Sequence, residues 1–257
     1  MLLVCLYTLM VIILQVVENF RISKSIFMDL LDGLDSSVES LRAHGISKKE
    51  KLAACLTFFA FGRYQHGVGK DFHIAMAQTT FSKVLRGTLK PFHTLNADWI
   101  CLSMTQEDRA AAKNYFNSKT GIQDVVMCVD GTHIKIKKPV IRPLLYLNKK
   151  SFYSINVMIV CDHKLRIRVV DARFPGSHHD AHIWRVSSVR NYFANLHNVE
   201  QNDKLLGDAG YPSEPWLVRP HRDPEEGTVE SEFNIKHSSG RIIVEQAIGV
   251  LKSRFRC

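Results

Sequence analysis

Along the chain, the spacing of apolar residues changes from helical in the first half to short unbroken runs in the second half. Between residues 19 and 44, apolar side chains recur at every third or fourth position, which predicts an amphipathic helix. A second helix is predicted to begin at Ser47, because this serine and Glu50 form the sequence signature of a capping box. A third helix is predicted over residues 104–116, with Thr105 as its N-cap. The chain before residue 120 is therefore expected to be helical.

Residues 69–88 predict two short helices, and the second of them carries a candidate DNA-binding surface. Its packed face is expected to hold Phe81, Val84 and Leu85. Hydrogen-bonding and basic side chains share the opposite face, as is typical of a helix that lies on DNA, and these are Gln78, Ser82, Lys83 and Arg86. A solvated helix face has a similar composition, so a helix-turn-helix and an ordinary surface helix both stay open. From Pro91 to Ser103 the sequence predicts a linker.

Three successive β-strands are predicted after residue 124. Residues 125–129 are all apolar and mostly β-branched, as in a buried central strand, and they lead directly into Asp130 and Gly131. The glycine predicts a turn or the close approach of another group, which would place Asp130 at the strand end. A half-exposed continuation is predicted over residues 134–138, because apolar and basic residues alternate there. Two further strands, joined by a turn, are predicted over residues 152–160 and 165–170.

The next part of the chain predicts a helix and another short strand, each with an aspartate at its beginning or end. Ser177 is the predicted cap of a helix that continues to Phe193. Asp180 falls in the first turn of this helix, where the helix dipole favours an anion. The short apolar strand over residues 204–206 leads to Asp208, which has glycine on both sides within two residues.

The last part predicts a loop over residues 215–234 and a helix over residues 240–255. Basic and acidic side chains recur at helical intervals along one face of this helix, and these are Arg241, Glu245, Lys252 and Arg256. Glu245 could therefore simply pair with Arg241 or Lys252 on the helix surface. Lys252 and Arg256 are candidates for holding the DNA backbone, and solvation of the helix is an equal alternative.

Three acidic residues, Asp130, Asp208 and Glu245, form a candidate metal site. The predicted element order would build a mixed sheet covered by helices, and it could place the ends of two neighbouring strands beside one helix. Three carboxylates that converged there could not all ionise without a cation between them. Oxygen ligands of this kind suit Mg²⁺ or Mn²⁺, and two such ions support phosphodiester cleavage. Taken singly, however, each aspartate could be a turn former.

Composition changes this picture in two ways. Lys and Arg outnumber Asp and Glu by 34 to 25, and the formal net charge of +9 favours polyanionic partners, with nucleic acid ahead of a membrane surface. The six cysteines form no Cys-x-x-Cys pair, which argues against a zinc ribbon or a redox motif. Cys55, Cys128 and Cys161 lie inside apolar runs and are expected in the core, as in a reduced intracellular protein.

Residues 1–17 are almost entirely apolar. The segment is slightly short for a membrane span, and it lacks the basic region and cleavage site of a secretory signal. We therefore expect a helix packed on the protein or an aberrant amino terminus, in preference to a membrane anchor.

Four motifs give the chain a family resemblance: DGTHI (130–134), PGSHHD (175–180), LLGDAGYP (205–212) and VEQAIGVLKSRFR (244–256). Together they resemble the DDE domain of Harbinger-type transposases and, more closely, the Harbinger transposase-derived nucleases. The resemblance extends over about residues 19–257. It implies an RNase H-like α/β fold with a helical N-terminal part, a divalent metal (Mg²⁺ or Mn²⁺), and hydrolysis or transfer of DNA strands. It also implies that Asp130, Asp208 and Glu245 are the catalytic and metal-binding triad, with Asp180 at the metal site or supporting it.

The expected organisation is an apolar segment (1–17), a helical region (18–120) and a nuclease domain (121–257). The resemblance implies DNA as substrate, a Myb-like DNA-binding protein as partner, and a location in the nucleus, with the cytoplasm as a second location. The apolar start and the end at Cys257 depart from the family pattern, which favours a truncated product. The alternative function is a catalytically inactive, transposase-derived DNA-binding or adaptor protein.

Overall fold

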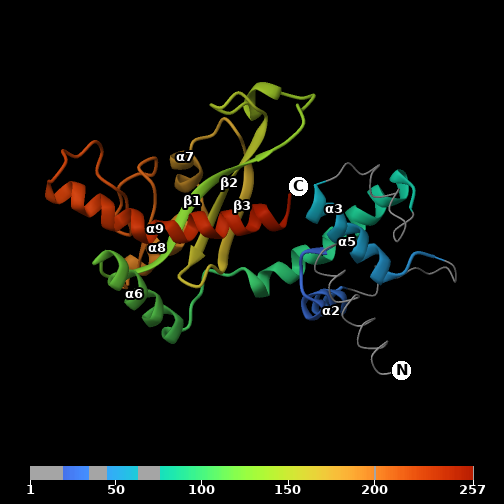
Figure 1. Ribbon diagram of the computed structural model, residues 1–257, viewed down its shortest axis with the longest axis horizontal. Coiled ribbons are helices and arrows are strands. Elements are labelled where there is room, and N and C mark those ends of the chain that lie inside the picture. Colours follow the sequence, from blue (N-terminus) through green and yellow to red (C-terminus); the bar gives the residue numbers. More distant parts are fainter. Residues whose placement is uncertain (1–19, 35–44, 63–75, 200, 257) are drawn as a thin grey trace, which may run out of the picture. The chain divides into compact units, whose positions relative to one another are not determined.

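The computed structural model describes residues 20–34, 45–62, 76–199 and 201–256, and it divides the chain into two compact units (Figure 1). One unit contains residues 100–249, and the other contains residues 1–99 together with 250–257. The predicted division into three segments at residues 17 and 120 stays a prediction. Each unit is described by itself.

A five-stranded mixed sheet forms the centre of the unit that contains residues 100–249. Its strand order is β3-β2-β1-β4-β5, so β1 lies in the middle. The first three strands are antiparallel, while β4 and β5 continue the sheet in parallel with β1. The bounds are β1 Val125–Lys135, β2 Ser154–Asp162, β3 Ile167–Pro175, β4 Lys204–Leu206 and β5 Leu217–Val218. This sheet and its flanking helices confirm the expected RNase H-like α/β class.

The position of Asp130 differs from the sequence prediction. β1 is one continuous strand that is paired with β2 from Met127 to Lys135, so Asp130 lies in its middle and not at its end. The prediction of a strand end at Asp130 was wrong, because the strand does not turn at Gly131. The glycine serves instead for the close approach of a side chain to the strand, which was the other role considered for it.

The helices of this unit are α6 Gln106–Thr120, α7 Asp180–Arg185, α8 Ser188–Asn198 and α9 Val229–Arg254, with a 3₁₀ turn, η2 Pro143–Tyr146, between β1 and β2. The last five residues of α9 belong to the other unit. Thr105 caps α6 by accepting a hydrogen bond from the Asp108 amide, as predicted. In Figure 1, α9 crosses β1, and the Cys128 thiol lies 3.7 Å from the Gly240 carbonyl oxygen.

Two helix predictions were wrong. The helix expected from Ser177 to Phe193 is broken, because the Ser187 hydroxyl accepts from the Arg190 amide and donates to the Trp184 carbonyl. Ser187 thereby ends α7 and caps α8, while the residue before α7 is His179 and Ser177 is not a cap. The final helix begins at Val229 and not at Gly240, so part of the expected loop is helical.

Gly240 lies inside α9 because the helix packs closely there. A Cβ at this position would lie 2.5 Å from the Thr120 methyl group and 2.8 Å from a methyl carbon of Leu206. The core beneath the helices contains large buried side chains, among them Trp184, Phe193 and Tyr211. Cys55, Cys128 and Cys161 are buried, as predicted.

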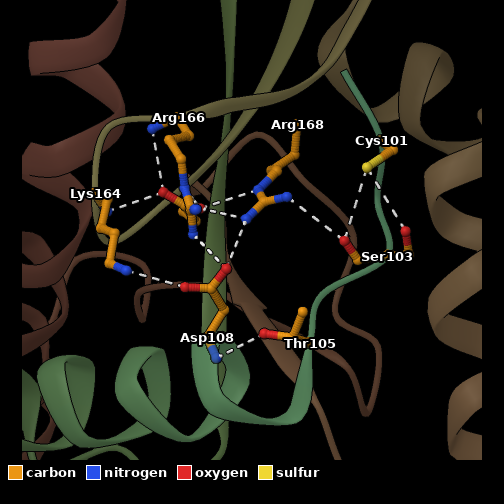
Figure 2. A network of polar contacts seen from close by, with 8 residues as sticks. Cys101, Ser103, Thr105, Asp108, Lys164, Arg166 and Arg168 are labelled. Carbon is orange, nitrogen blue, oxygen red and sulfur yellow. Dashed lines mark hydrogen bonds and ion pairs between the residues drawn. The ribbon is translucent and has the colours of Figure 1, made fainter. Parts of the chain in front are cut away.

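A network of charged groups joins the β2–β3 turn to the start of α6 (Figure 2). Asp108, in the first turn of α6, pairs with Lys164 at 3.0 Å and with Arg166 at 2.9 Å. Asp162, whose side chain is fully buried, pairs with Arg166 and Arg168, each at 2.8 Å. Arg168 also reaches the Ser103 carbonyl oxygen at 3.5 Å. The antiparallel part of the sheet is therefore fixed to α6 by ion pairs as well as by apolar packing.

The other unit is helical in its described part. It contains α2 Lys24–Gly33, α3 Lys48–Phe61 and α5 Gln78–Trp99. The predicted capping box is present, because Ser47 accepts from the Glu50 amide and Glu50 accepts from the Ser47 amide. Gly62 ends α3 in the left-handed conformation. The expected helical N-terminal part is thus confirmed.

The linker expected after Pro91 was a wrong prediction, because α5 continues without a break to Trp99. Proline normally interrupts a helix, since it lacks an amide hydrogen and its ring meets the carbonyl group four residues earlier. The sequence nevertheless keeps apolar residues at helical spacing on both sides of it, namely Leu85, Leu89, Phe92 and Leu95. This periodicity was the better signal.

Candidate active site

Asp130 extends from the middle of β1 toward α9. Its Oδ2 lies 3.1 Å from Nη1 of Arg241, while its Oδ1 accepts a hydrogen bond from the Gly131 amide at 2.9 Å. Only 17% of the side chain is exposed. The central strand therefore presents a carboxylate that is largely removed from solvent.

Glu245 lies on α9, one helical turn after Arg241. Its carboxylate is half exposed and forms an ion pair with Nη2 of Arg241. The surface pairing considered from the sequence is therefore present, but the same guanidinium also binds Asp130. Arg241 thus joins two members of the predicted triad, a role that their helical spacing alone did not reveal.

Asp208 follows β4, the strand that pairs in parallel with β1. Its Oδ1 accepts a hydrogen bond from the Gly210 amide at 2.8 Å, so it does form a local turn. Its charge also reaches the neighbouring elements, because it raises the pKa of Asp130 and of Arg241. Asp208 is therefore a turn former that also contributes to the field around Asp130.

The electrostatics of the site are those of clustered carboxylates beside the guanidinium of Arg241. Burial raises the pKa of Asp130, and the charge of Asp208 adds to this effect, while Arg241 opposes it. Burial would lower the pKa of Arg241, but Asp130 and Glu245 raise it overall. The guanidinium thus partly neutralises the negative charge that gathers between β1, β4 and α9.

Asp180 approaches β1 from the other side of the sheet. It lies against Gly131, where a Cβ would be only 2.3 Å from Oδ1 of Asp180. Neighbouring residues of a strand point to opposite faces, so Asp180 and the Asp130 side chain lie on different faces of β1. The side-chain amide of Asn156 donates to Oδ1 of Asp180 at 2.8 Å and to the His178 carbonyl oxygen at 2.9 Å. This geometry favours a supporting role for Asp180.

Replacing Gly131 by Ala is expected to destabilise the protein by about 1–3 kcal/mol, because the new methyl group must displace the Asp180 carboxylate. Chemical denaturation of both proteins measures this. The control is Gly249→Ala on α9, where a Cβ would meet nothing within 4 Å and where alanine favours the helix. Removing Asp180 as well should recover part of the loss. Equal stability of Gly131→Ala and the wild type would contradict the close approach.

Two further residues near the site were not identified from the sequence. Tyr211 is buried, and its hydroxyl has no hydrogen-bond partner among the residues described. Burial raises the pKa of Tyr211, and Asp180, Asp130 and Asp208 all add to the shift, so this ring lies within reach of three carboxylates. His237 on α9 is buried with its Nε2 3.1 Å from the Val218 carbonyl oxygen, and burial lowers its pKa. Tyr211 could have been found from the LLGDAGYP motif that contains it.

The donor chemistry of the triad fits Mg²⁺ or Mn²⁺, since all three groups supply carboxylate oxygens. Their present arrangement does not yet form a chelate. Within the part of the chain that is described, no group of three His, Cys, Asp or Glu side chains is placed to hold a metal ion. Asp130 and Glu245 are instead both bound to Arg241. The residues therefore fit the ion in kind, but two of the three carboxylates are paired with Arg241.

The candidate DNA-binding residues lie in the helical unit. In α5, Phe81 and Val84 are buried and Leu85 packs against the same cluster, while Gln78, Lys83 and Arg86 are exposed and Ser82 is half-buried, which confirms the predicted two faces. The partner helix of the proposed helix-turn-helix falls mostly outside the described residues. Lys252 and Arg256 are exposed and also belong to this unit. Residues 1–17 lie outside the described residues, and in the described part no helix is long and apolar enough to cross a membrane.

Comparison with known proteins places these residues in a family context. Residues 129–257 match the model of a family described as "DDE superfamily endonuclease", and this range includes Asp130, Asp208 and Glu245. The chain is 29% identical over 226 residues to the proteins named "Putative nuclease HARBI1" of Bos taurus and Homo sapiens, covering 88% of this chain and 63% of each relative. It is 26% identical over 157 residues to "Protein ALP1-like" of Arabidopsis thaliana, covering 56% of this chain and 39% of that protein.

These matches confirm the resemblance to Harbinger transposase-derived proteins. The chain spans less than two thirds of the length of these curated relatives. No solved structure matches the chain.

Proposed function

Because the chain belongs to the DDE superfamily endonuclease family, we propose that it is a divalent-metal-dependent nuclease that cleaves DNA phosphodiester bonds through Asp130, Asp208 and Glu245. The observation that supports this most directly is the meeting of β1, the end of β4 and α9. There Asp130 is within the field of Asp208 and is linked to Glu245 through one guanidinium. Excess negative charge of this kind calls for a cation.

The three carboxylates would have different tasks. Asp130 and Asp208 would hold the metal, since both come from the rigid sheet or its immediate end. Glu245, which is half exposed on α9, would complete the coordination and orient the attacking water. When bound, the metal would lower the pKa of a water molecule and stabilise charge on the phosphate. Asp180 would act through its contact with Gly131 and not as a ligand.

The proposal is tested by incubating the purified chain with plasmid and oligonucleotide DNA in Mg²⁺, Mn²⁺, Ca²⁺ or EDTA. Nicking or cutting is expected with Mg²⁺ or Mn²⁺. Little is expected with Ca²⁺, whose looser coordination would misplace the nucleophile. Glu245→Gln, purified in the same way, controls for contaminating nuclease. Equal cleavage by both proteins, or cleavage by neither in any metal, would overturn the proposal. If neither protein cleaves but DNA binding is retained, the chain would be a DNA-binding or adaptor protein. Nuclear location and a Myb-like partner are further proposals, which imaging and pull-down experiments test.

DNA binding through α5 predicts a measurable salt effect. Affinity should fall steeply as salt rises, since each phosphate contact releases counterions. The double variant Lys83→Ala and Arg86→Ala removes two exposed cations from α5 and should reduce the slope of log K against log salt by about 2. Anisotropy titrations at several salt concentrations measure this slope.

The matched control removes Lys48 and Lys49 from the first turn of α3, which changes the net charge by the same amount. Both double variants should keep the thermal stability of the wild type. If the two variants lower the slope equally, the effect would be one of overall charge and α5 would not be the binding surface.

A further inference from the structure

Arg241 is the one group seen to bind two of the three triad carboxylates in the described structure. Its Nη1 lies 3.1 Å from Oδ2 of Asp130, and its Nη2 pairs with Glu245. Its side chain is 19% exposed, so the guanidinium lies within the site and not on an open helix face. A planar guanidinium can bind two carboxylates at once, whereas an ammonium group acts as a single point charge.

The same oxygens are the ones that a divalent cation would need. Oδ1 of Asp130 accepts from the Gly131 amide and Oδ2 is paired with Arg241, so both oxygens of this carboxylate already have a partner. Glu245 is drawn to the same guanidinium. A metal at this position would also meet the positive charge of Arg241 at close range, which would repel it.

We propose that Arg241 is an internal competitor of the metal: its guanidinium neutralises Asp130 and Glu245 in the metal-free protein, and a divalent cation binds only when Arg241 leaves them. This inference rests on the proposed metal site and concerns its regulation. Arg241 is thus a positioning residue: it keeps Asp130 and Glu245 close to one another, and it lowers the affinity of the site for metal.

The test is metal binding without DNA and without catalysis. Isothermal titration of the EDTA-treated full chain with Mn²⁺ is compared for the wild type, Arg241→Gln and Arg241→Lys. Loss of the guanidinium removes both its hold on the two carboxylates and its repulsion of the metal, and a tenfold gain in affinity corresponds to only about 1.4 kcal/mol. Arg241→Gln should therefore bind Mn²⁺ about tenfold more tightly than the wild type. Arg241→Lys, which can hold only one carboxylate well, should lie between them.

Thermal unfolding in EDTA supplies the second measurement. Arg241→Gln leaves the carboxylates without their cation, so its metal-free form should unfold at a lower temperature, and added Mn²⁺ should raise that temperature by more than in the wild type. Circular dichroism establishes that the variant is folded. Arg173→Gln is the matched control, because Arg173 also pairs with an aspartate, Asp171, but is 67% exposed and binds no member of the triad in the described structure. It should change neither Mn²⁺ affinity nor the response to metal.

Unchanged or weaker Mn²⁺ binding by folded Arg241→Gln would overturn the inference, as would the absence of binding by all variants. These outcomes are separable from those of the nuclease proposal. Metal-dependent cleavage by the wild type with no gain of affinity in Arg241→Gln would leave the nuclease standing and remove the competition. Tighter Mn²⁺ binding by Arg241→Gln without DNA cleavage by the wild type would support the competition and remove the nuclease.

Discussion

Asp130→Asn is expected to lower the rate of metal-dependent DNA cleavage by several orders of magnitude. Asparagine keeps the size of the side chain and can still accept from the Gly131 amide, but it removes the negative charge that would hold the metal. Charge stabilisation at the transferring phosphoryl group is the dominant catalytic term in such reactions, so little activity should remain. Single-turnover cleavage in Mg²⁺ and Mn²⁺ measures the loss.

Measuring the stability of Asp130→Asn distinguishes a loss of catalysis from a loss of folding. Burial raises the pKa of Asp130, so the charged carboxylate costs the folded protein free energy above that pKa. Asparagine avoids this cost, and metal-free Asp130→Asn should be at least as stable as the wild type at neutral pH. The difference should vanish at a pH low enough to protonate Asp130 in both the folded and the unfolded state. A variant that is inactive but also unfolded would not support the catalytic role, whereas a folded and active one would contradict it.

Asp180→Ala is the internal comparison for the triad. Asp180 lies on the other side of β1 and touches Gly131, so its removal should shift the strand slightly and leave the charges of the triad in place. We expect a smaller loss, of about 10- to 100-fold, as is usual when a residue supports a ligand without binding the metal. A loss as large as that of Asp130→Asn would place Asp180 among the ligands.

The sequence was sufficient for those parts of the fold that local patterns determine. The apolar run at residues 125–129 identified the central strand, and the capping signals at Ser47 and Thr105 located two helix starts correctly. Such signals are local, because a cap residue satisfies amide groups only two or three positions away. The order of the elements then limited the sheet to a mixed type, which the structure confirms.

The errors arose where packing overrides local preference. A turn was one of two roles considered for Gly131, and Gly240 was taken as the first residue of the last helix, although each is a place where another element comes too close for a Cβ. Pro91 was treated as a stop, although the apolar spacing continued on both sides of it. Neither type of residue reveals from sequence alone whether it ends an element or fits inside one.

The candidate site was predicted as a set of residues but not as an arrangement. The motifs identified Asp130, Asp208 and Glu245, and whether they form the catalytic triad stays a prediction. The link from Asp130 to Arg241 joins positions 111 residues apart, which no local pattern can reveal. The spacing of Arg241 and Glu245 indicated an ion pair, but only the packing of α9 on β1 made it part of the site.

Asp162→Ala is expected to destabilise the unit that contains the sheet by about 3–5 kcal/mol. The Asp162 side chain is fully buried, and it accepts hydrogen bonds from the amides of Lys164 and Arg166 as well as pairing with two arginines. Arg166 can turn toward water after the change, but Arg168 is only 8% exposed and would keep a buried charge whose remaining carboxylate partner, Asp108, lies 3.8 Å away. Removing one partner of a buried ion pair typically costs this much.

Two comparisons and a pH series make this prediction specific. Asp162→Asn keeps an acceptor for the two backbone amides and should lose less stability than Asp162→Ala. Asp171→Ala removes a carboxylate whose partner, Arg173, is exposed, and it should cost about 1 kcal/mol or less. Burial opposes ionisation of Asp162, but its hydrogen bonds and arginines lower its pKa overall. Its contribution is therefore complete above the unfolded pKa of about 3.9 and is lost as pH falls through the lower folded value. Denaturation curves of wild type and Asp162→Ala should accordingly converge only in strong acid. At pH 7, Asp162→Ala could lower the free energy of unfolding by no more than Asp171→Ala does. The buried network would then have no net role in holding α6 to the sheet.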